Sequence, residues 1–256
     1  QKGNQTLPRW SGGRYKRLAC IALHASGGLI AGMDTGVFHL QPADDGTLVC
    51  TLISAVQHPQ AGMRFNDGRC DRQGRFWAGT MVRDMSLAQP AGGLYRQDAR
   101  GLSAPQVQSL VTQNGLAFSP DGATMYLSDS HPSVQKIWSL DLHDDGSLGP
   151  RREFVHMREL PGRPQAAVDT DGCYWICAND AGLMHRFTPS GVLDRSLAVP
   201  VSKPSMCSFG GPDMDLLFIT SIRPGQPQGN DAANGGAVFV TRPGAQGLAE
   251  APYQSA

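Results

Sequence analysis

The sequence has no excess charge of either sign, because 22 lysines and arginines balance 22 aspartates and glutamates among its 256 residues. A balanced chain produces no summed field that would draw it to nucleic acid, an anionic membrane or a strongly charged protein. We therefore expect neither a nucleic-acid nor a membrane partner. A small, weakly charged ligand fits this composition better.

Long apolar runs and a recognisable N-terminal signal are also lacking. No apolar stretch approaches the ~20 residues that span a bilayer, and no basic segment followed by an apolar one opens the chain. We expect a cytoplasmic protein that is a monomer or a weak homo-oligomer. The chain starts with Gln1 rather than methionine, so the missing signal carries little weight.

Cysteine is sparse, and it lacks the paired C-x-x-C spacing of a zinc ribbon. The six cysteines are scattered through a chain too large to need disulfides for stability. Cys173 and Cys177 flank Trp175 at a period of two, which on a strand places both side chains on one face. We predict free, buried thiols.

No segment sustains the 3.6-residue apolar period of a long helix, whereas 31 glycines and 18 prolines punctuate the chain. Short apolar runs follow glycine turns five times. They align on Ile30, Trp77, Tyr126, Trp175 and Phe218, at steps of 47, 49, 49 and 43 residues. Short strands repeated at a step near fifty are typical of an all-β propeller, with one four-stranded blade per unit.

We predict a single propeller domain over residues 1–256, with five blades visible from about residue 17 to residue 253. Residues 1–16 supply only a strand or so of a further blade. The spacing alone leaves two alternatives, a ring of five blades or a sixth blade that is mostly missing. The Gly-His and Trp-Asp signature of WD40 propellers is absent.

Two asparagines occupy the same register in consecutive units. Asn66 lies eight residues before the turn glycine Gly74, and Asn114 lies eight before Gly122. The innermost strand of a blade leads into this turn, and a buried amide without a partner costs about 1 to 3 kcal/mol. We therefore expect both amides to face a polar ligand on the axis. Arg64 shares the face of Asn66 because strand side chains alternate.

Turn formation is the competing interpretation of these asparagines. The tripeptide Asn66-Asp67-Gly68 and the dipeptide Asn114-Gly115 both have ordinary turn composition. The matching register favours the axial interpretation. Asp121 and Asp171, in "PDG" and "TDG", are better explained as turn residues.

Seven stretches together resemble one known family. They are "RFNDGRCDRQGRFWAGTM", "NGLAFSPDGATMYLSDS", "AVDTDGCYWICANDAGLMHRFTPSG", "SKPSMCSFGG", "LFITSIR", "GGAVFV" and "GLAEAPY". The resemblance is to the regucalcin (senescence marker protein) and gluconolactonase family, six-bladed propellers that hydrolyse sugar lactones with a divalent metal on the axis. It implies a six-bladed all-β propeller whose first blade is incomplete in this chain.

The resemblance also implies roles for the axial residues. Asn114 matches a metal ligand of the family, and the metal would be Zn, Ca, Mn or Mg. Arg64 and Asn66 match residues that contact the substrate or its water near the metal. The small-molecule partner implied is a sugar lactone.

Two charged residues of the family pattern are missing. Nothing before Arg17 matches the glutamate ligand of the first blade. In "GRPQAAVDTDG" the slot of the metal-binding aspartate, which also serves as general base, is taken by Pro164, or by Gln165 after a one-residue slip. Neither side chain accepts a proton at neutral pH, so we assign no catalytic residue. The family match places Asp129 and Asp169 in framework positions.

Three hypotheses follow. The first is metal-dependent hydrolysis of a sugar lactone to its acid. The second is a catalytically impaired propeller that binds a sugar acid or a protein partner, because the charged ligands are missing. The third is that the sequence omits residues present in the molecule, which would account for both the missing blade and the shortened loop at residues 163–166.

Overall fold

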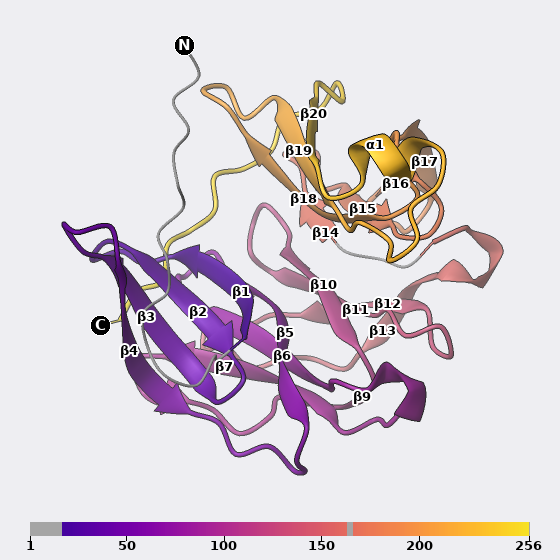
Figure 1. The fold of residues 1–256 in the computed structure, drawn as a ribbon. Helices are drawn as coiled ribbons and strands as arrows, with labels where there is room; N and C mark the ends of the chain where they lie inside the picture. Colours follow the sequence, from indigo (N-terminus) through magenta and orange to yellow (C-terminus); the bar gives the residue numbers. More distant parts are fainter. Residues whose placement is uncertain (1–16, 163–165, 256) are drawn as a thin grey trace.

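The computed structural model of the protein describes residues 17–162 and 166–255, and the regular elements there are almost all antiparallel strands. The strands form five consecutive sheets that follow one another around the molecule (Figure 1). In each sheet the strands pair mainly in chain order, as in a propeller blade. The all-β propeller prediction is confirmed.

The first sheet consists of β1 (Leu18–Leu23), β2 (Leu29–Met33), β3 (Gly36–Pro42) and β4 (Leu48–Ala55). The second consists of β5 (Met63–Cys70), β6 (Phe76–Val82), β7 (Gly92–Asp98) and β8 (Gly101–Leu102), and β9 (Val107–Leu110) also pairs with β7. The third consists of β10 (Gln113–Phe118), β11 (Thr124–Asp129), β12 (Lys136–Asp141) and β13 (Arg152–His156).

The fourth sheet consists of β14 (Ala166–Val168), β15 (Tyr174–Ala178), β16 (Leu183–Phe187) and β17 (Leu193–Ala198). The fifth consists of β18 (Pro204–Gly210), β19 (Leu216–Ser221) and β20 (Val238–Thr241). Three single-turn helices lie in connections: η1 (Met85–Leu87), η2 (Met157–Glu159) and α1 (Asn230–Asn234). In the described part of the chain, no helix has the length and apolar character needed to cross a membrane.

The repeat found in the sequence matches the sheets. Its five alignment residues lie on the second strand of each sheet, namely β2, β6, β11, β15 and β19. The turns that precede four of these strands contain glycines with φ between 73° and 79°, a region that favours glycine: Gly28, Gly74, Gly122 and Gly172. The hydrophobic core lies between neighbouring sheets, where for example Trp77 and Leu94 of the second sheet pack with Leu116 and Phe118 of the third.

The number of blades differs from the prediction. Five sheets are present in the described residues, so the count of six, which came from the family resemblance and not from units seen in this sequence, is wrong for this part of the chain. Residues 1–16, predicted to be the remnant of a further blade, lie outside the described residues.

Neighbouring sheets pack through their first strands, in the order β1, β5, β10, β14 and β18. Between β18 and β1 lies a cavity of about 640 Å³, lined by residues of both strands. The C-terminal segment runs from the fifth sheet back to the first (Figure 1). There the backbone N–H of Tyr253 donates to Leu23 O (2.8 Å), and Ala25 N–H donates to Tyr253 O (3.0 Å).

The cysteine prediction is confirmed. None of the six cysteines forms a disulfide, and all but the partly exposed Cys50 are buried. Cys173 directly precedes β15 and Cys177 lies within it, so the two cysteines flank Trp175.

Candidate functional site

The innermost strands of the second and third sheets are interrupted next to the two asparagines. The pairing of β5 with β6 shifts between Phe65 and Gly68, and that of β10 with β11 shifts between Asn114 and Ala117. Such bulges re-aim side chains and often lie beside functional sites. Both asparagines are therefore strand residues at bulges, and the turn interpretation is wrong for each.

Arg64 and Asn66 form a hydrogen-bonded pair, as expected from their alternation on one strand. Arg64 Nη1 donates to Asn66 Oδ1 (2.9 Å) and to the backbone oxygen of Phe65 (2.8 Å). Asn66 Nδ2 in turn donates to Gln113 O on β10 (2.7 Å). Asn66 thereby ties the arginine to the neighbouring sheet.

The remaining donors of Arg64 are not used by the described part of the protein. A guanidinium carries five N–H groups, and both hydrogens of Nη1 are accounted for by these two contacts. Within residues 17–162 and 166–255, Nε and Nη2 have no hydrogen-bond acceptor. Burial lowers the pKa of Arg64 from its ordinary value, with the neighbouring charges of Arg17 and Arg83 acting in the same direction.

Asn114 is almost fully buried, with 5% of its surface exposed. Its Nδ2 donates to the hydroxyl of Ser130 (2.9 Å), which itself lies 3.5 Å from Thr112 O. No described side chain or backbone N–H donates to Asn114 Oδ1. The carbonyl oxygen is thus the free group of this amide.

Arg64, Asn66 and Asn114 all line one cavity of about 520 Å³, which we call the axial cavity. The structure therefore brings together the three site residues that the sequence singled out. The same cavity is also lined by Lys203, just before β18, and by Arg223, just after β19. These two cations lie within "SKPSMCSFGG" and "LFITSIR", to which the sequence analysis gives no role.

The described residues do not suit a divalent cation. Three of those lining the cavity are positively charged and none is a carboxylate, whereas hard cations prefer several oxygens, usually including carboxylates. Nor do the described residues contain any group of three or more His, Cys, Asp and Glu side chains placed to hold a metal. Asn114 offers a single neutral oxygen.

The predicted slot of the general base, Pro164 or Gln165, lies outside the described residues. On one side of it, Pro161 O contacts His185 Nε2 (3.1 Å). On the other side, Ala166 O accepts from Arg69 Nη2 (3.1 Å).

Asp129 and Asp169 are framework residues, in agreement with the sequence interpretation. Asp129 accepts from the backbone N–H groups of Val111 (2.7 Å) and Thr112 (2.9 Å). Asp169 accepts from Trp175 Nε1 and from Arg186 Nε, both at 2.8 Å. Both carboxylates are essentially inaccessible to solvent, so neither is available to a ligand in the cavity.

Asn66 and Asn114 also border the cavity between β18 and β1. That cavity contains an ion pair, Arg69 Nη1 with Glu250 Oε1 at 3.2 Å. Asp67 lines it as well, with its Oδ2 accepting from Leu116 N (2.9 Å). Burial raises the pKa of the Asp67 carboxyl above its ordinary value.

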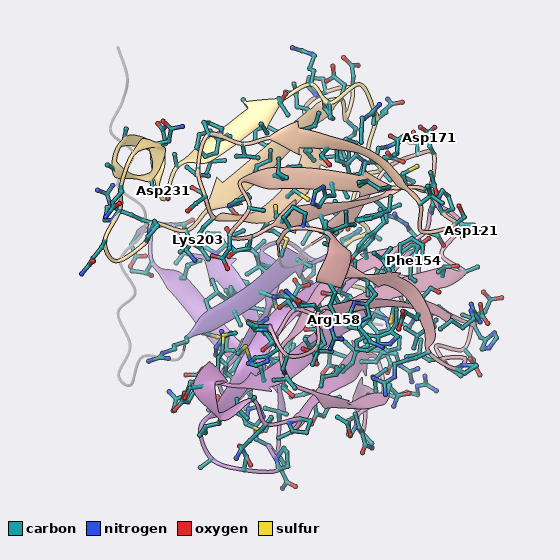
Figure 2. The ribbon with its side chains drawn as sticks, turned by 90° about the vertical axis from the view of Figure 1, so that its right-hand side faces the viewer. Asp121, Phe154, Arg158, Asp171, Lys203 and Asp231 are labelled. Carbon is teal, nitrogen blue, oxygen red and sulfur yellow. The ribbon has the colours of Figure 1, made fainter. Side chains whose placement is uncertain are left out.

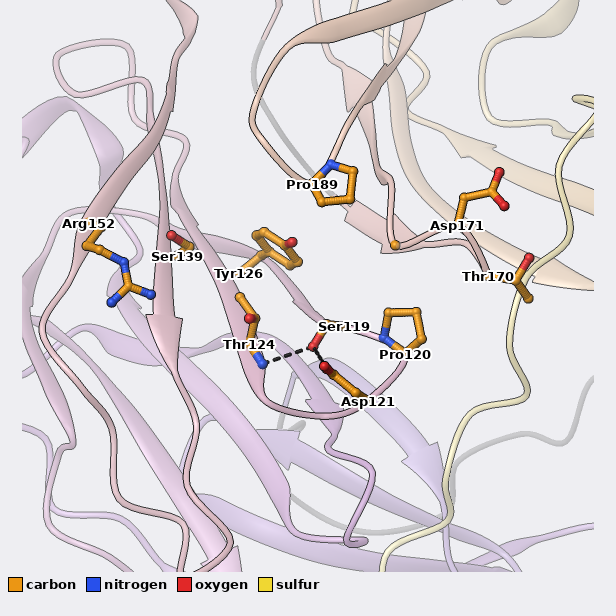
Figure 3. A pocket seen from close by; sticks show the side chains of 11 residues that line it. Ser119, Pro120, Asp121, Thr124, Tyr126, Ser139, Arg152, Thr170, Asp171 and Pro189 are labelled. Atoms are coloured by element: carbon orange, nitrogen blue, oxygen red, sulfur yellow. Dashed lines mark hydrogen bonds between the residues drawn. The ribbon is translucent and has the colours of Figure 1, made fainter.

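A third hollow, of about 560 Å³, lies between the hairpin turns of the third and fourth sheets (Figure 3). Its two carboxylates are used by the turns themselves. Asp121 accepts from the hydroxyl of Ser119 (2.5 Å), and Asp171 pairs with Arg186 (2.7 Å). Figure 2 shows Asp121 and Asp171 together on one side and Lys203 on the other. This hollow is thus separate from the axial cavity, and both aspartates are turn residues as predicted.

Comparison with known proteins shows the family of this chain. A family model described as "SMP-30/Gluconolactonase/LRE-like region" matches residues 3–223. The chain belongs to this family. It is 36% identical over 242 residues to 6-deoxy-6-sulfogluconolactonase of Pseudomonas putida, an alignment that covers 92% of this chain and 80% of the relative.

A further relative and a solved structure are also similar to this chain. The chain is 32% identical over 243 residues to L-arabinolactonase of Azospirillum brasilense, covering 93% of this chain and 78% of that one. Among solved structures, regucalcin of Agrobacterium tumefaciens, described as a calcium-binding protein, superposes with a TM-score of 0.82 at 25% identity. That superposition covers 93% of this chain and 79% of the other.

Proposed function

We propose that this protein hydrolyses a sugar lactone to the corresponding sugar acid. Family membership and the lactonase relatives support this reaction class. The structural observation that carries the proposal is the Arg64 guanidinium, which lines the axial cavity with three N–H groups left over after its contacts with Phe65 and Asn66.

In this reaction a water oxygen bonds to the lactone carbonyl carbon, whose oxygen becomes an oxyanion. The bond to the ring oxygen then breaks, and the proton lost by water ends on that oxygen as the hydroxyl of the acid. Arg64 stabilises the developing oxyanion through its unused N–H groups. Asn66 positions Arg64, and the Oδ1 of Asn114 accepts from a substrate hydroxyl or from the attacking water.

No carboxylate or histidine in the described lining of the cavity can remove the proton from water. A divalent metal, proposed from the resemblance to regucalcin and from the calcium-binding description of the A. tumefaciens relative, has only one assigned protein ligand here, Asn114. Metal dependence is therefore a separate part of the proposal, and we derive no step from it.

The test measures ring opening of D-glucono-1,5-lactone and of L-arabinonolactone. The rate is monitored as acid release in weakly buffered solution, and the spontaneous rate is subtracted. The assay is run with EDTA and with added Zn²⁺, Mn²⁺, Ca²⁺ or Mg²⁺. Removal of one oxyanion donor typically costs about 10²- to 10³-fold in kcat, so we expect Arg64→Met to lose about that much. Arg100→Met is the matched control, because Arg100 is exposed, does not line the cavity and is not among the charges that act on Arg64.

Asn114→Ala tests the amide separately, by activity and by metal affinity. Loss of either one supports the site. Retention of both would contradict the role given to Asn114.

A second candidate function is the binding of a sugar acid without turnover. The observation that favours it is the lack of a general base among the described residues of the cavity. Calorimetric titration with gluconate distinguishes the two functions. Binding without lactone turnover under any metal condition would establish the second, and enzymatic turnover would exclude it.

A further inference from the structure

The axial cavity is markedly positive for a protein with no net charge. Arg64, Lys203 and Arg223 line it, and no aspartate or glutamate is among its described lining residues. The three cations come from two separate parts of the fold. Arg64 is on β5 of the second sheet, and the other two flank β18 and β19 of the fifth.

The three cations differ in how far the protein itself neutralises them. Lys203 forms an ion pair with Asp180, outside the lining of the cavity. Its charge also contributes to lowering the pKa of Asp231, whose main cause is the hydrogen bond from Ser202. Arg223, by contrast, has no carboxylate partner among the residues that the structure describes. It is the cation left to bind an external anion.

A buried hydroxyl supplies a second, independent sign of a missing ligand. Thr112 also lines the cavity, and 4% of its surface is exposed. Its Oγ1 is buried and has no hydrogen-bond partner in the described part of the molecule. Since buried polar groups nearly always have a partner, the orphaned hydroxyl indicates that a polar molecule completes this wall.

We propose that the lactone bound here carries a second group that is permanently anionic, such as a sulfonate, carboxylate or phosphate on the sugar, and that Arg223 recognises it. This inference rests on the proposed lactone hydrolysis. The reaction itself generates one negative charge, for which Arg64 is sufficient. Arg223, just after β19, lines the same cavity from another segment than Arg64, so it binds a substituent other than the lactone carbonyl.

The test compares kcat/KM for two lactones, D-glucono-1,5-lactone, which is neutral, and 6-phospho-D-glucono-1,5-lactone, which is anionic at its far end. A hydrogen bond between charged groups discriminates by roughly tenfold or more. We expect the native protein to prefer the anionic lactone by at least about tenfold. We also expect Arg223→Met to reduce this preference by about tenfold, and 0.5 M NaCl to reduce it in the native protein through screening.

Arg100→Met is the control, because Arg100 is an exposed arginine of the β7–β8 turn that does not line the cavity. It should leave the preference unchanged. Equal use of the two lactones by the native protein would overturn the inference. An Arg223→Met variant that lowers both kcat/KM values equally would overturn it too, because it would show a general structural effect.

Different results would contradict lactone hydrolysis and the anion site at Arg223. If no lactone is opened, the function is wrong, and calorimetry with gluconate and 6-phosphogluconate still tests the anion site. Tighter binding of 6-phosphogluconate that is lost in Arg223→Met supports the site in that case. Equal affinity for the two acids removes it.

Discussion

At the residue scale, a cluster of one aspartate, one arginine and one tryptophan occurs in two of the sheets. Each cluster stabilises its own sheet. In the second sheet, Asp71 Oδ2 accepts from Arg75 Nε (2.5 Å) and Trp77 Nε1 (2.7 Å). In the fourth sheet, Asp169 Oδ2 accepts from Trp175 Nε1 and from Arg186 Nε. A carboxylate buried at the start of each turn thus fixes the tryptophan that marks the repeat in the sequence.

This arrangement predicts a strong effect of Asp169→Asn. The amide would place an NH₂ group opposite two donors, and it would leave Arg186 without its buried partner. Breaking a buried ion pair costs about 3 to 5 kcal/mol. We expect a loss of that order in the free energy of unfolding, measured by urea denaturation.

Asp171→Asn is the matched control for that change. Asp171 pairs with the same arginine, but its side chain is 71% exposed, and exposed pairs contribute about 0 to 1 kcal/mol. Equal destabilisation by the two substitutions would show that the buried carboxylate has no special role.

At the scale of elements, the C-terminal segment joins the first two sheets. Its backbone bonds to Leu23 and Ala25 of the first sheet, and Gln254 N–H donates to Gly74 O of the second (2.9 Å). The side chain of Tyr253 is buried in the cluster that contains Ile30 and Phe76. Its Oη lies 3.4 Å from Gln97 Nε2.

Tyr253→Ala should therefore destabilise the protein by about 3 to 5 kcal/mol, as expected for removal of a buried aromatic ring. Tyr253→Phe keeps the ring and loses only a long hydrogen bond, so its expected cost is below about 1 kcal/mol. Guanidinium denaturation of both variants measures the difference. A small effect of the alanine variant would mean that the segment contributes little to the packing of the two sheets.

The strand position of the two asparagines was predictable from the sequence, whereas the bulges beside them were not. Register along the repeat placed Asn66 and Asn114 on the innermost strands, because the turn glycines fix the count of residues. The distortion of those strands was not foreseen, since Asn-Gly composition is shared by turns and bulges. Gly115, with φ of 61°, adopts its left-handed conformation within β10.

At the scale of the whole molecule, the fold class was predictable because a propeller repeats one local pattern. The positive cavity was not predictable, because its cations come from segments more than 100 residues apart in sequence, at Arg64 and at Lys203 and Arg223. Each is an unremarkable surface charge when considered along the chain. Only closure of the sheets around the axis brings them to one place.

Stability of the whole molecule should fall in mild acid, in part through His185. Burial lowers the pKa of this histidine below its ordinary value of 6.5. Its Nε2 donates to Pro161 O, so in the neutral ring Nδ1 accepts from the hydroxyl of Ser196 (2.7 Å). Its contribution to stability is complete above the unfolded pKa of about 6.5, and it is lost as pH falls toward the lower pKa of the folded state.

We therefore expect the Tm of the native protein to decrease between pH 7.5 and pH 5, and the decrease to be shallower in His185→Gln. Differential scanning fluorimetry across this range measures both curves. His143→Gln, at an exposed position, is the control and should follow the native curve. A His185→Gln curve parallel to the native one would remove this histidine from the explanation.

Asn66 and Asn114 each border both the axial cavity and the cavity between β18 and β1, so these two side chains stand between the two cavities. Shortening both side chains is therefore expected to join the two cavities, at the cost of the contacts that Asn66 and Asn114 make with Gln113 and Ser130.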